Sequence, residues 1–151
     1  MNSDLQTLYQ EIILDHNKNP RNFRVMADAT QTLEGFNPLC GDRYTIFLKM
    51  RGDVVMDITF QGSGCAISKA SASVMSTIVK GKRKEEVLDW FMKFRELVTG
   101  KLDAHNREEE LGKLAAFAGV SEFPARVKCA SLAWHTLKGA LELSTATVST
   151  E

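Results

Sequence analysis

Three cysteines and one aspartate are the residues of this chain best suited to metal or sulfur chemistry. Cys40 and Asp42 belong to the segment Cys-Gly-Asp, Cys65 ends the segment Gly-Ser-Gly-Cys, and Cys129 stands far along the chain. Three thiolates and a carboxylate fit a tetrahedral Zn²⁺ site, and iron–sulfur clusters accept the same thiolate-rich set. The spacing does not choose between these metals, and free thiols packed in a core are a third interpretation.

Alternating apolar residues predict a β-hairpin between the first two cysteine segments. Residues 44–50 and 54–60 each place every second side chain on one apolar face. Between them, Arg51-Gly52-Asp53 predicts a three-residue connection with a glycine. Pairing of Met50 with Val54 keeps every apolar residue of both strands on one side, and this pairing defines the predicted register.

Extension of this register predicts where three of the ligand candidates meet. It places Cys40 opposite Gly64, so that Cys65 arrives beside Cys40. Asp42 follows Cys40 by two residues in an extended segment, and both side chains therefore point the same way. Cys40, Asp42 and Cys65 are thus expected to converge at the open end of the hairpin.

Cys129 can reach this site only by tertiary packing. Apolar periodicity predicts helices over about 4–15, 66–79, 84–98 and 107–118, and from about Pro124 onward. Cys65 would stand at the N-terminus of the second helix, where unpaired N–H groups favour the thiolate. Cys129 lies in the first turns of the last helix, where Arg126 shares its face and could stabilise a thiolate or carboxylate. Taken alone, Cys129 is more typical of a small buried core residue than of a ligand.

The remaining pattern predicts one α+β domain over residues 1–151. A strand is expected near Thr30–Glu34, and residues 145–151 are typical of a frayed tail. His16, near a helix end, is expected to be a favourable charge or a turn contact rather than a ligand.

Composition excludes several classes of function. Nineteen basic residues balance nineteen acidic ones, so no overall positive charge is available to bind nucleic acid or an anionic membrane. Apolar runs are too short for a membrane span, and the first residues lack a secretory signal, so we expect a cytoplasmic location. The chain has no phosphate-binding loop, no Ser-His-Asp arrangement and no paired-carboxylate signature, which gives a hydrolase little support.

Around these cysteines the chain resembles the IscU/NifU-N family of sulfur-handling scaffolds, and within it the SufU type. The resemblance runs nearly end to end, through Leu8-Tyr9, Asp15-His16-Asn17-Lys18-Asn19-Pro20-Arg21-Asn22, Asn37-Pro38-Leu39-Cys40-Gly41-Asp42, Phe60-Gln61-Gly62-Ser63-Gly64-Cys65-Ala66-Ile67-Ser68 and Arg126-Val127-Lys128-Cys129-Ala130. It implies the IscU-like (SufE/NifU) fold, a small antiparallel sheet of about three strands with helices packed on one face.

Three departures from the IscU type match the SufU type. Lys128 stands where IscU-type scaffolds carry a histidine, and the interval from Cys65 to Cys129 is longer than in those scaffolds. The proline-proline-valine-lysine run by which a chaperone recognises IscU-type proteins is absent from the sequence. These departures favour zinc over cluster building.

The SufU type implies a zinc-dependent sulfurtransferase. Such a protein accepts persulfide sulfur from a pyridoxal-phosphate cysteine desulfurase of the SufS type and passes it toward downstream Suf cluster-assembly proteins. The implied zinc ligands are Cys40, Asp42, Cys65 and Cys129, with Cys40 as the sulfur acceptor because it lies on a loop. We hypothesise that a desulfurase side chain, a histidine as the family suggests, replaces Cys40 on the metal. Arg126 is the implied cation beside the site or against the partner.

Two alternatives use the same residues. A scaffold would assemble a [2Fe–2S] cluster on them and then transfer it, whereas a purely structural zinc domain would use the metal only to fold.

Overall fold

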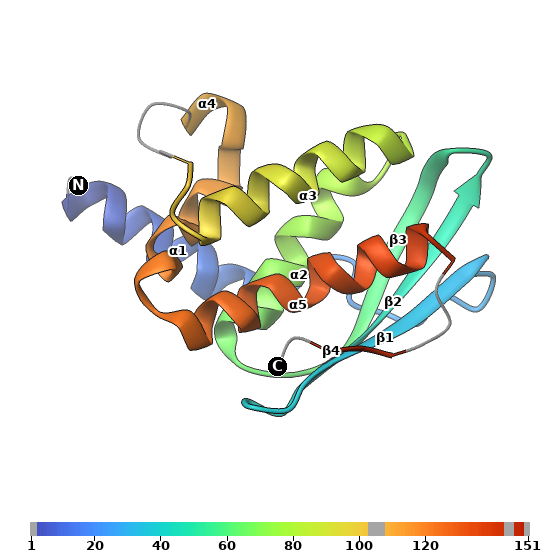
Figure 1. Cartoon of the computed structure of the whole chain (residues 1–151), viewed down its shortest axis with the longest axis horizontal. Coiled ribbons are helices and arrows are strands. Elements are labelled where there is room, and N and C mark those ends of the chain that lie inside the picture. Colours follow the sequence, from blue (N-terminus) through green and yellow to red (C-terminus); the bar gives the residue numbers. More distant parts are fainter. Residues whose placement is uncertain (1–2, 103–107, 144–146, 150–151) are drawn as a thin grey trace.

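A computed structural model describes residues 3–102, 108–143 and 147–149. Its elements in chain order are α1 (Ser3–Lys18), β1 (Gln31–Asn37), β2 (Asp42–Arg51), β3 (Val54–Ser63), α2 (Ala66–Val79), α3 (Lys84–Val98), α4 (Glu108–Leu111), the 3₁₀ helix η2 (Gly112–Glu122), α5 (Pro124–Leu141) and β4 (Val148–Ser149) (Figure 1). The predicted α+β class is confirmed. No helix within these residues is long and apolar enough to cross a membrane.

Within the described residues the sheet has four strands, in the order β3-β2-β1-β4. The first three are antiparallel neighbours, as expected, whereas β4 runs parallel to β1 and pairs Val148 with Gly35 and Ser149 with Phe36. The expected count of about three strands is therefore one short, and the prediction of a frayed tail is wrong for Val148 and Ser149. A two-residue strand is too short for alternating polarity to reveal it.

The β2–β3 hairpin forms where predicted, but its register differs. Arg51 pairs with Val54 across a two-residue turn, and a β-bulge interrupts the ladder between Lys49 and Met50. Gly52 makes this tight turn possible because its φ is +60°. A three-residue connection without a bulge was the wrong expectation, since alternating polarity reports which face a residue occupies but not its partner.

The corrected register keeps the predicted apolar face from Tyr44 to Leu48 and at Ile58 and Phe60 and moves its partners. Toward the turn the bulge reverses the face, so that Val55 is buried and Met56 is exposed. Ile46 pairs with Phe60 and Tyr44 with Gly62, so β3 is displaced by two residues from the predicted pairing. An even displacement preserves the direction of each side chain, and Tyr44, Ile46 and Phe60 are fully buried. Asp42 begins β2 just beyond the last pair, Arg43 with Ser63.

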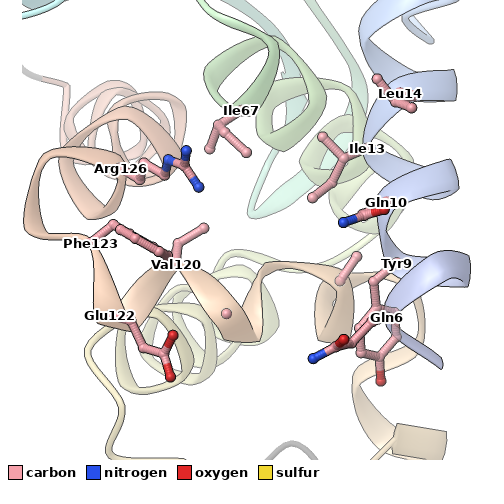
Figure 2. Close-up of a pocket in the computed structure, with 12 residues that line it drawn as sticks. Gln6, Tyr9, Gln10, Ile13, Leu14, Ile67, Val120, Glu122, Phe123 and Arg126 are labelled. Carbon is pink, nitrogen blue, oxygen red and sulfur yellow. The ribbon is translucent and has the colours of Figure 1, made fainter. Parts of the chain in front are cut away.

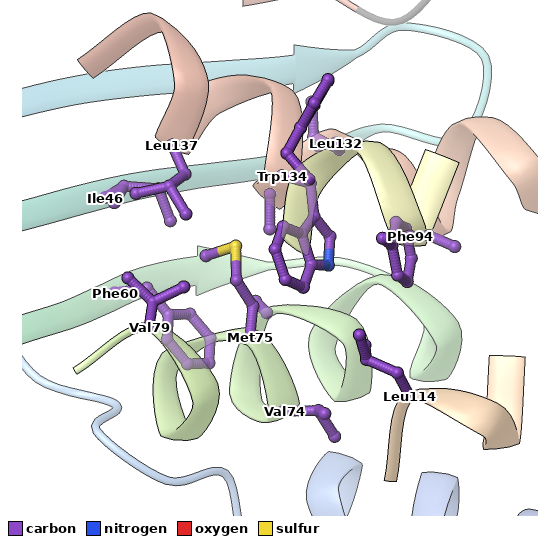
Figure 3. Close-up of a cluster of buried hydrophobic side chains, with 14 of the residues drawn as sticks. Ile46, Phe60, Val74, Met75, Val79, Phe94, Leu114, Leu132, Trp134 and Leu137 are labelled. Carbon is purple, nitrogen blue, oxygen red and sulfur yellow. The ribbon is translucent and has the colours of Figure 1, made fainter. Parts of the chain in front are cut away.

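Helices α2 and α5 pack against the sheet and against each other, and α1 and α3 pack outside them. The core between them is aromatic and aliphatic, with Trp134 and Met75 pointing toward one another from α5 and α2 (Figure 3). Trp134 also stacks on Phe94 of α3, with ring centroids 5.0 Å apart. This packing positions the N-terminus of α2 and the first turns of α5 beside the ends of β1 and β2.

Most helix predictions are confirmed, and one is wrong. Helices α2 and α3 have the predicted bounds, α5 begins at Pro124 as expected, and α1 continues to Lys18. The helix expected over about 107–118 is instead the short α4 followed by η2, and Arg107 lies outside the described residues. Gly112 explains the break, because its φ of +56° does not belong to a right-handed helix.

His16 is not an exposed charge at a helix end. Its side chain is 1% exposed, and Nδ1 lies 2.7 Å from the hydroxyl oxygen of Ser73 on α2. Burial, with smaller contributions from the cations Arg21 and Lys113, lowers the pKa of His16 to about 4. His16 is therefore a neutral, buried link between α1 and α2.

Candidate metal centre

Cys40 lies at the turn between β1 and β2. Asn37 ends β1 and is the Cα partner of Asp42, which begins β2, so the four residues between them form a tight loop. The loop closes when the Gly41 N–H donates to the carbonyl oxygen of Asn37 at 2.8 Å, and Gly41 has a φ of +74°. Cys40 is exposed on this loop. A thiol held this way is accessible to solvent and to a partner.

Asp42 connects the loop to the N-terminus of α2. It is fully buried, and its Oδ1 accepts the Cys65 N–H at 2.8 Å. Its Oδ2 lies 3.8 Å from the Cys65 sulfur. The Asp42 carboxyl group is therefore held between the loop of Cys40 and the N-terminus of α2.

Cys65 is the N-cap of α2, as the sequence predicts. Its φ and ψ are −70° and 168°, and its sulfur accepts the Ser68 N–H at 3.4 Å. The Ser68 hydroxyl lies 3.6 Å from the same sulfur and 3.0 Å from the hydroxyl of Tyr44. The Ser68 N–H at this helix end thus holds the sulfur of the exposed Cys65 side chain.

Cys129 reaches the site from α5. Its side chain is buried, and its sulfur lies 3.2 Å from the sulfur of Cys40 although 89 residues separate the two. Burial raises the pKa of the Cys129 thiol, and its contacts with Cys40 and Asp42 raise it further. Without a cation at the site, Cys129 therefore keeps its proton, and a metal ion would have to displace that proton.

The structure brings three of the four ligand candidates into one group. One ligand atom each from Cys40, Asp42 and Cys129 lies within 4.8 Å of the others. Cys65 is outside this group but touches Asp42. The prediction that the hairpin itself brings Cys65 beside Cys40 is wrong in its pairing, because Cys65 lies against Asp42 and Cys129 lies against Cys40.

This donor set fits zinc. The site offers four donors of the types that zinc takes in tetrahedral sites. They are the Asp42 carboxylate, the clustered thiols of Cys40 and Cys129, and the Cys65 thiol, which touches that carboxylate. Asp42 is the one hard ligand candidate beside three soft thiols. The same thiols also suit an iron–sulfur cluster, so the donor types leave both metals open.

Gly64 allows the carboxylate to lie this close to the α2 N-terminus. A Cβ at position 64 would lie 2.5 Å from Asp42 Oδ1, 2.6 Å from the Ser68 hydroxyl and 2.7 Å from the Tyr44 hydroxyl. These distances are well below van der Waals contact, so a side chain here would displace the polar groups around the site.

Arg126 precedes Cys129 by three residues on α5, and its side chain packs on a neighbouring aromatic ring. Its guanidinium lies over the Phe123 ring, 4.5 Å from the ring centroid. It lines a cavity of about 770 Å³ between α1, η2 and the start of α5, with Ile67 from the beginning of α2 on the same wall (Figure 2). Among the described residues no hydrogen bond or ion pair joins Arg126 to Asp42 or to the thiols.

Sequence reasoning missed two side chains that touch the thiols. Asn37 donates from Nδ2 to the Cys129 sulfur at 3.7 Å, and Ser68 contacts the Cys65 sulfur. For Ser68 a signal existed, since it stands three residues after an N-cap, where helix-capping partners are common. For Asn37 the sequence showed only an Asn-Pro turn, and its sulfur contact depends on a residue 92 positions away.

The chain is similar to proteins of one family over most of its length. Residues 8–130 match the family described as NifU-like N terminal domain. The zinc-dependent sulfurtransferase SufU of Bacillus subtilis strain 168 is 44% identical over 137 residues, which cover 91% of each chain. The iron-sulfur cluster assembly scaffold protein IscU of Streptococcus pyogenes serotype M1 is 40% identical over 142 residues, or 94% of this chain and 87% of that protein.

A solved structure has the same fold. The crystal structure of a putative iron-sulfur cluster assembly scaffold protein for the SUF system, from Fervidobacterium islandicum AW-1, superposes with a TM-score of 0.81 at 37% identity. It covers 93% of this chain and 99% of its own. Because sequence and structure agree over most of its length, this chain belongs to the NifU-like N-terminal domain family.

Proposed function

We propose that this chain is a zinc-dependent sulfurtransferase that accepts persulfide sulfur for iron–sulfur cluster assembly. The Bacillus subtilis relative, named as such a sulfurtransferase, supports the proposal. The observation that carries it is the contrast between two thiols in contact: Cys40 is exposed, Cys129 is buried, and their sulfurs are 3.2 Å apart. One thiol can meet a donor while the other stays in the site.

Cys40 is the sulfur acceptor in this proposal. Its thiolate attacks the outer sulfur of a persulfide on the donor protein and forms a new S–S bond. The donor's S–S bond breaks, and the donor cysteine leaves as a thiolate, so the sulfur moves without net oxidation or reduction. Exposure on a turn suits this role, because the attacking sulfur must approach the donor along the S–S axis.

Cys40, Asp42, Cys65 and Cys129 would hold the zinc ion. Bound zinc supplies a positive charge that keeps the thiols deprotonated near neutral pH. A metal-bound thiolate is a poor nucleophile, so Cys40 attacks only when it is not bound to the ion. Asp42, Cys65 and Cys129 would hold the ion meanwhile. The contact of Asp42 with the α2 N-terminus stabilises that remaining arrangement.

The donor would be a pyridoxal-phosphate cysteine desulfurase of the SufS type, and downstream Suf proteins would take the sulfur. Arg126 is the residue we propose to contact the desulfurase. It is exposed, stacks on the exposed Phe123 and lies on the same helix as Cys129. A cation and an aromatic ring beside the site form a surface suited to protein contact.

The test measures metal and sulfur on the same samples. Elemental analysis of the purified protein should give about one zinc per chain, and incubation with a cysteine desulfurase and cysteine should add one sulfur atom to the Cys40 peptide in mass spectrometry. Cys40→Ser should abolish the added sulfur. Gln31→Ala, on β1 but bonded to Ala140 away from the thiols, is the matched control and should still carry sulfur on Cys40. Sulfur transfer that persists in Cys40→Ser would contradict the assignment.

A scaffold function is the second candidate, because the Streptococcus pyogenes relative is named as one. Anaerobic reconstitution with iron and sulfide after zinc removal separates the two functions. A scaffold would yield a stable cluster that transfers to an apo-ferredoxin, whereas the sulfurtransferase would bind zinc in preference. Lys128 directly before Cys129, where IscU-type scaffolds carry a histidine, favours the sulfurtransferase.

A further inference from the structure

Asn37 is a buried polar side chain at the centre of the candidate site that the ligand set does not use. It ends β1, is fully buried and has hydrogen-bond partners at both ends of its amide. Oδ1 accepts the Leu39 N–H at 3.2 Å, and Nδ2 donates to the Cys129 sulfur at 3.7 Å. One side chain therefore connects the loop that carries Cys40 with the helix that carries Cys129.

The orientation of this amide follows from its neighbours. The Leu39 N–H can only donate, so it requires the carbonyl oxygen of Asn37 on its side. The amide nitrogen then faces the Cys129 sulfur as a donor. A donor in this position holds the sulfur and fixes its orientation, as hydrogen-bond partners of metal ligands do.

The two sulfurs in contact therefore have different surroundings. Cys129 is buried and accepts an amide N–H, whereas Cys40 is exposed, and its one recorded hydrogen bond within the described residues comes from the Cys129 thiol. When a cation holds both, the Cys129 thiolate has an additional stabilising partner and the Cys40 thiolate does not. This difference ranks the two cysteines by how readily each leaves the metal.

We infer that Asn37 is a positioning residue that retains Cys129 in the site and leaves Cys40 as the exchangeable thiol. The inference rests on the proposed function, in which Cys40 must become free while the other ligands stay. Asn37 serves both halves of that requirement, since its Oδ1 shapes the Cys40 loop and its Nδ2 holds the Cys129 sulfur.

Two substitutions separate these two contacts. Asn37→Ala removes both hydrogen bonds. Asn37→Asp keeps the acceptor for the Leu39 N–H but replaces the amide group that donates to the Cys129 sulfur by a carboxylate oxygen, which cannot donate. Gln31→Ala is the matched control, because Gln31 also lies on β1 and donates to α5, at the Ala140 carbonyl oxygen, away from the thiols. Circular dichroism and thermal unfolding establish that each variant is folded.

The readouts need no desulfurase. Zinc affinity is measured by competition with a chelating dye, and the zinc-loaded protein is treated with iodoacetamide while mass spectrometry follows Cys40 and Cys129 separately. Loss of a partner that orients a metal ligand weakens metal binding by about 10–100-fold, and we expect losses in that range for both Asn37 variants. In the unsubstituted protein Cys40 should be alkylated first. In both variants the preference for Cys40 over Cys129 should fall by about tenfold, while Gln31→Ala should change neither quantity.

Two results would overturn the inference. One is a folded Asn37→Asp protein with unchanged zinc affinity and unchanged preference for Cys40. The other is a loss of preference in Gln31→Ala equal to that in Asn37→Ala, which would make the effect one of general packing between β1 and α5. Failure of sulfur transfer to Cys40 would instead contradict the proposed function and leave these metal and alkylation results standing.

Discussion

Gly64→Ala should damage the metal site while leaving the backbone able to accept the new residue. The φ of Gly64 lies outside the left-handed region, so alanine is conformationally allowed there. The added Cβ, however, would lie 2.5 Å from Asp42 Oδ1 and 2.6 and 2.7 Å from the Ser68 and Tyr44 hydroxyls. Each polar atom must withdraw by about 0.7–0.9 Å to reach the 3.4 Å of an ordinary contact.

The withdrawal breaks or lengthens two hydrogen bonds. The bond from the Cys65 N–H to Asp42 is made to a charged group, and such bonds contribute about 1.5–3 kcal/mol. The Tyr44–Ser68 hydroxyl bond, at 3.0 Å, contributes about 1 kcal/mol. We therefore expect Gly64→Ala to lower the free energy of unfolding by about 3 kcal/mol. A loss of 1 kcal/mol lowers Tm by roughly 2–4 °C in a protein of this size, so Tm should fall by about 6–12 °C.

The assay pairs thermal unfolding with zinc competition. Displacement of Asp42 should weaken zinc binding by at least about tenfold. Gly52→Ala at the β2–β3 turn is the control, since Gly52 has a φ of +60° and a Cβ added there would meet no heavy atom within 4 Å. The left-handed strain there costs about 1–2 kcal/mol but lies away from the site, so zinc affinity should not change. A folded Gly64→Ala protein with Tm within about 2 °C of the original, below the smallest shift expected here, and with full zinc affinity would refute this reasoning.

Two further predictions concern stability away from the metal site. Because burial depresses the pKa of His16 to about 4, its neutral form contributes stability above the ordinary pKa of 6.5 that is lost as pH falls toward 4. The free energy of unfolding, measured with urea, should fall by about 2 kcal/mol between about pH 7 and pH 5. His16→Gln should reduce this decrease, and an equal decrease in the variant would contradict the assignment. Gly35→Ala would drive a Cβ into the Thr136 hydroxyl on α5 and should cost about 2 kcal/mol in urea unfolding. The double variant with Thr136→Ala should recover at least about 1 kcal/mol, and strict additivity of the two changes would exclude this contact as the cause.

Local patterns in the sequence were sufficient for the elements and for the type of site. Apolar periodicity predicted the bounds of α2, which put Cys65 at a helix N-cap, and alternating polarity predicted the buried face of the hairpin except next to its turn. These features depend on neighbours two to four residues apart, so they can be read along the chain. The four ligand candidates followed from residue types, and the family resemblance is confirmed by a match over residues 8–130.

Only the tertiary structure decided which residues distant in sequence contact one another. The predicted register failed because a β-bulge and a two-residue turn shift strand pairing, and near the turn the bulge buries Val55 in place of Met56. The contact of Cys129 with Cys40 depends on how α5 packs on the sheet, and the bond from Asn37 to Cys129 joins residues 92 positions apart. His16 has the sequence position of a helix-end charge, but Ser73 and the surrounding core bury it. Periodicity carries the direction of a side chain relative to its own element, whereas the identity of the atom it meets depends on the packing of distant elements.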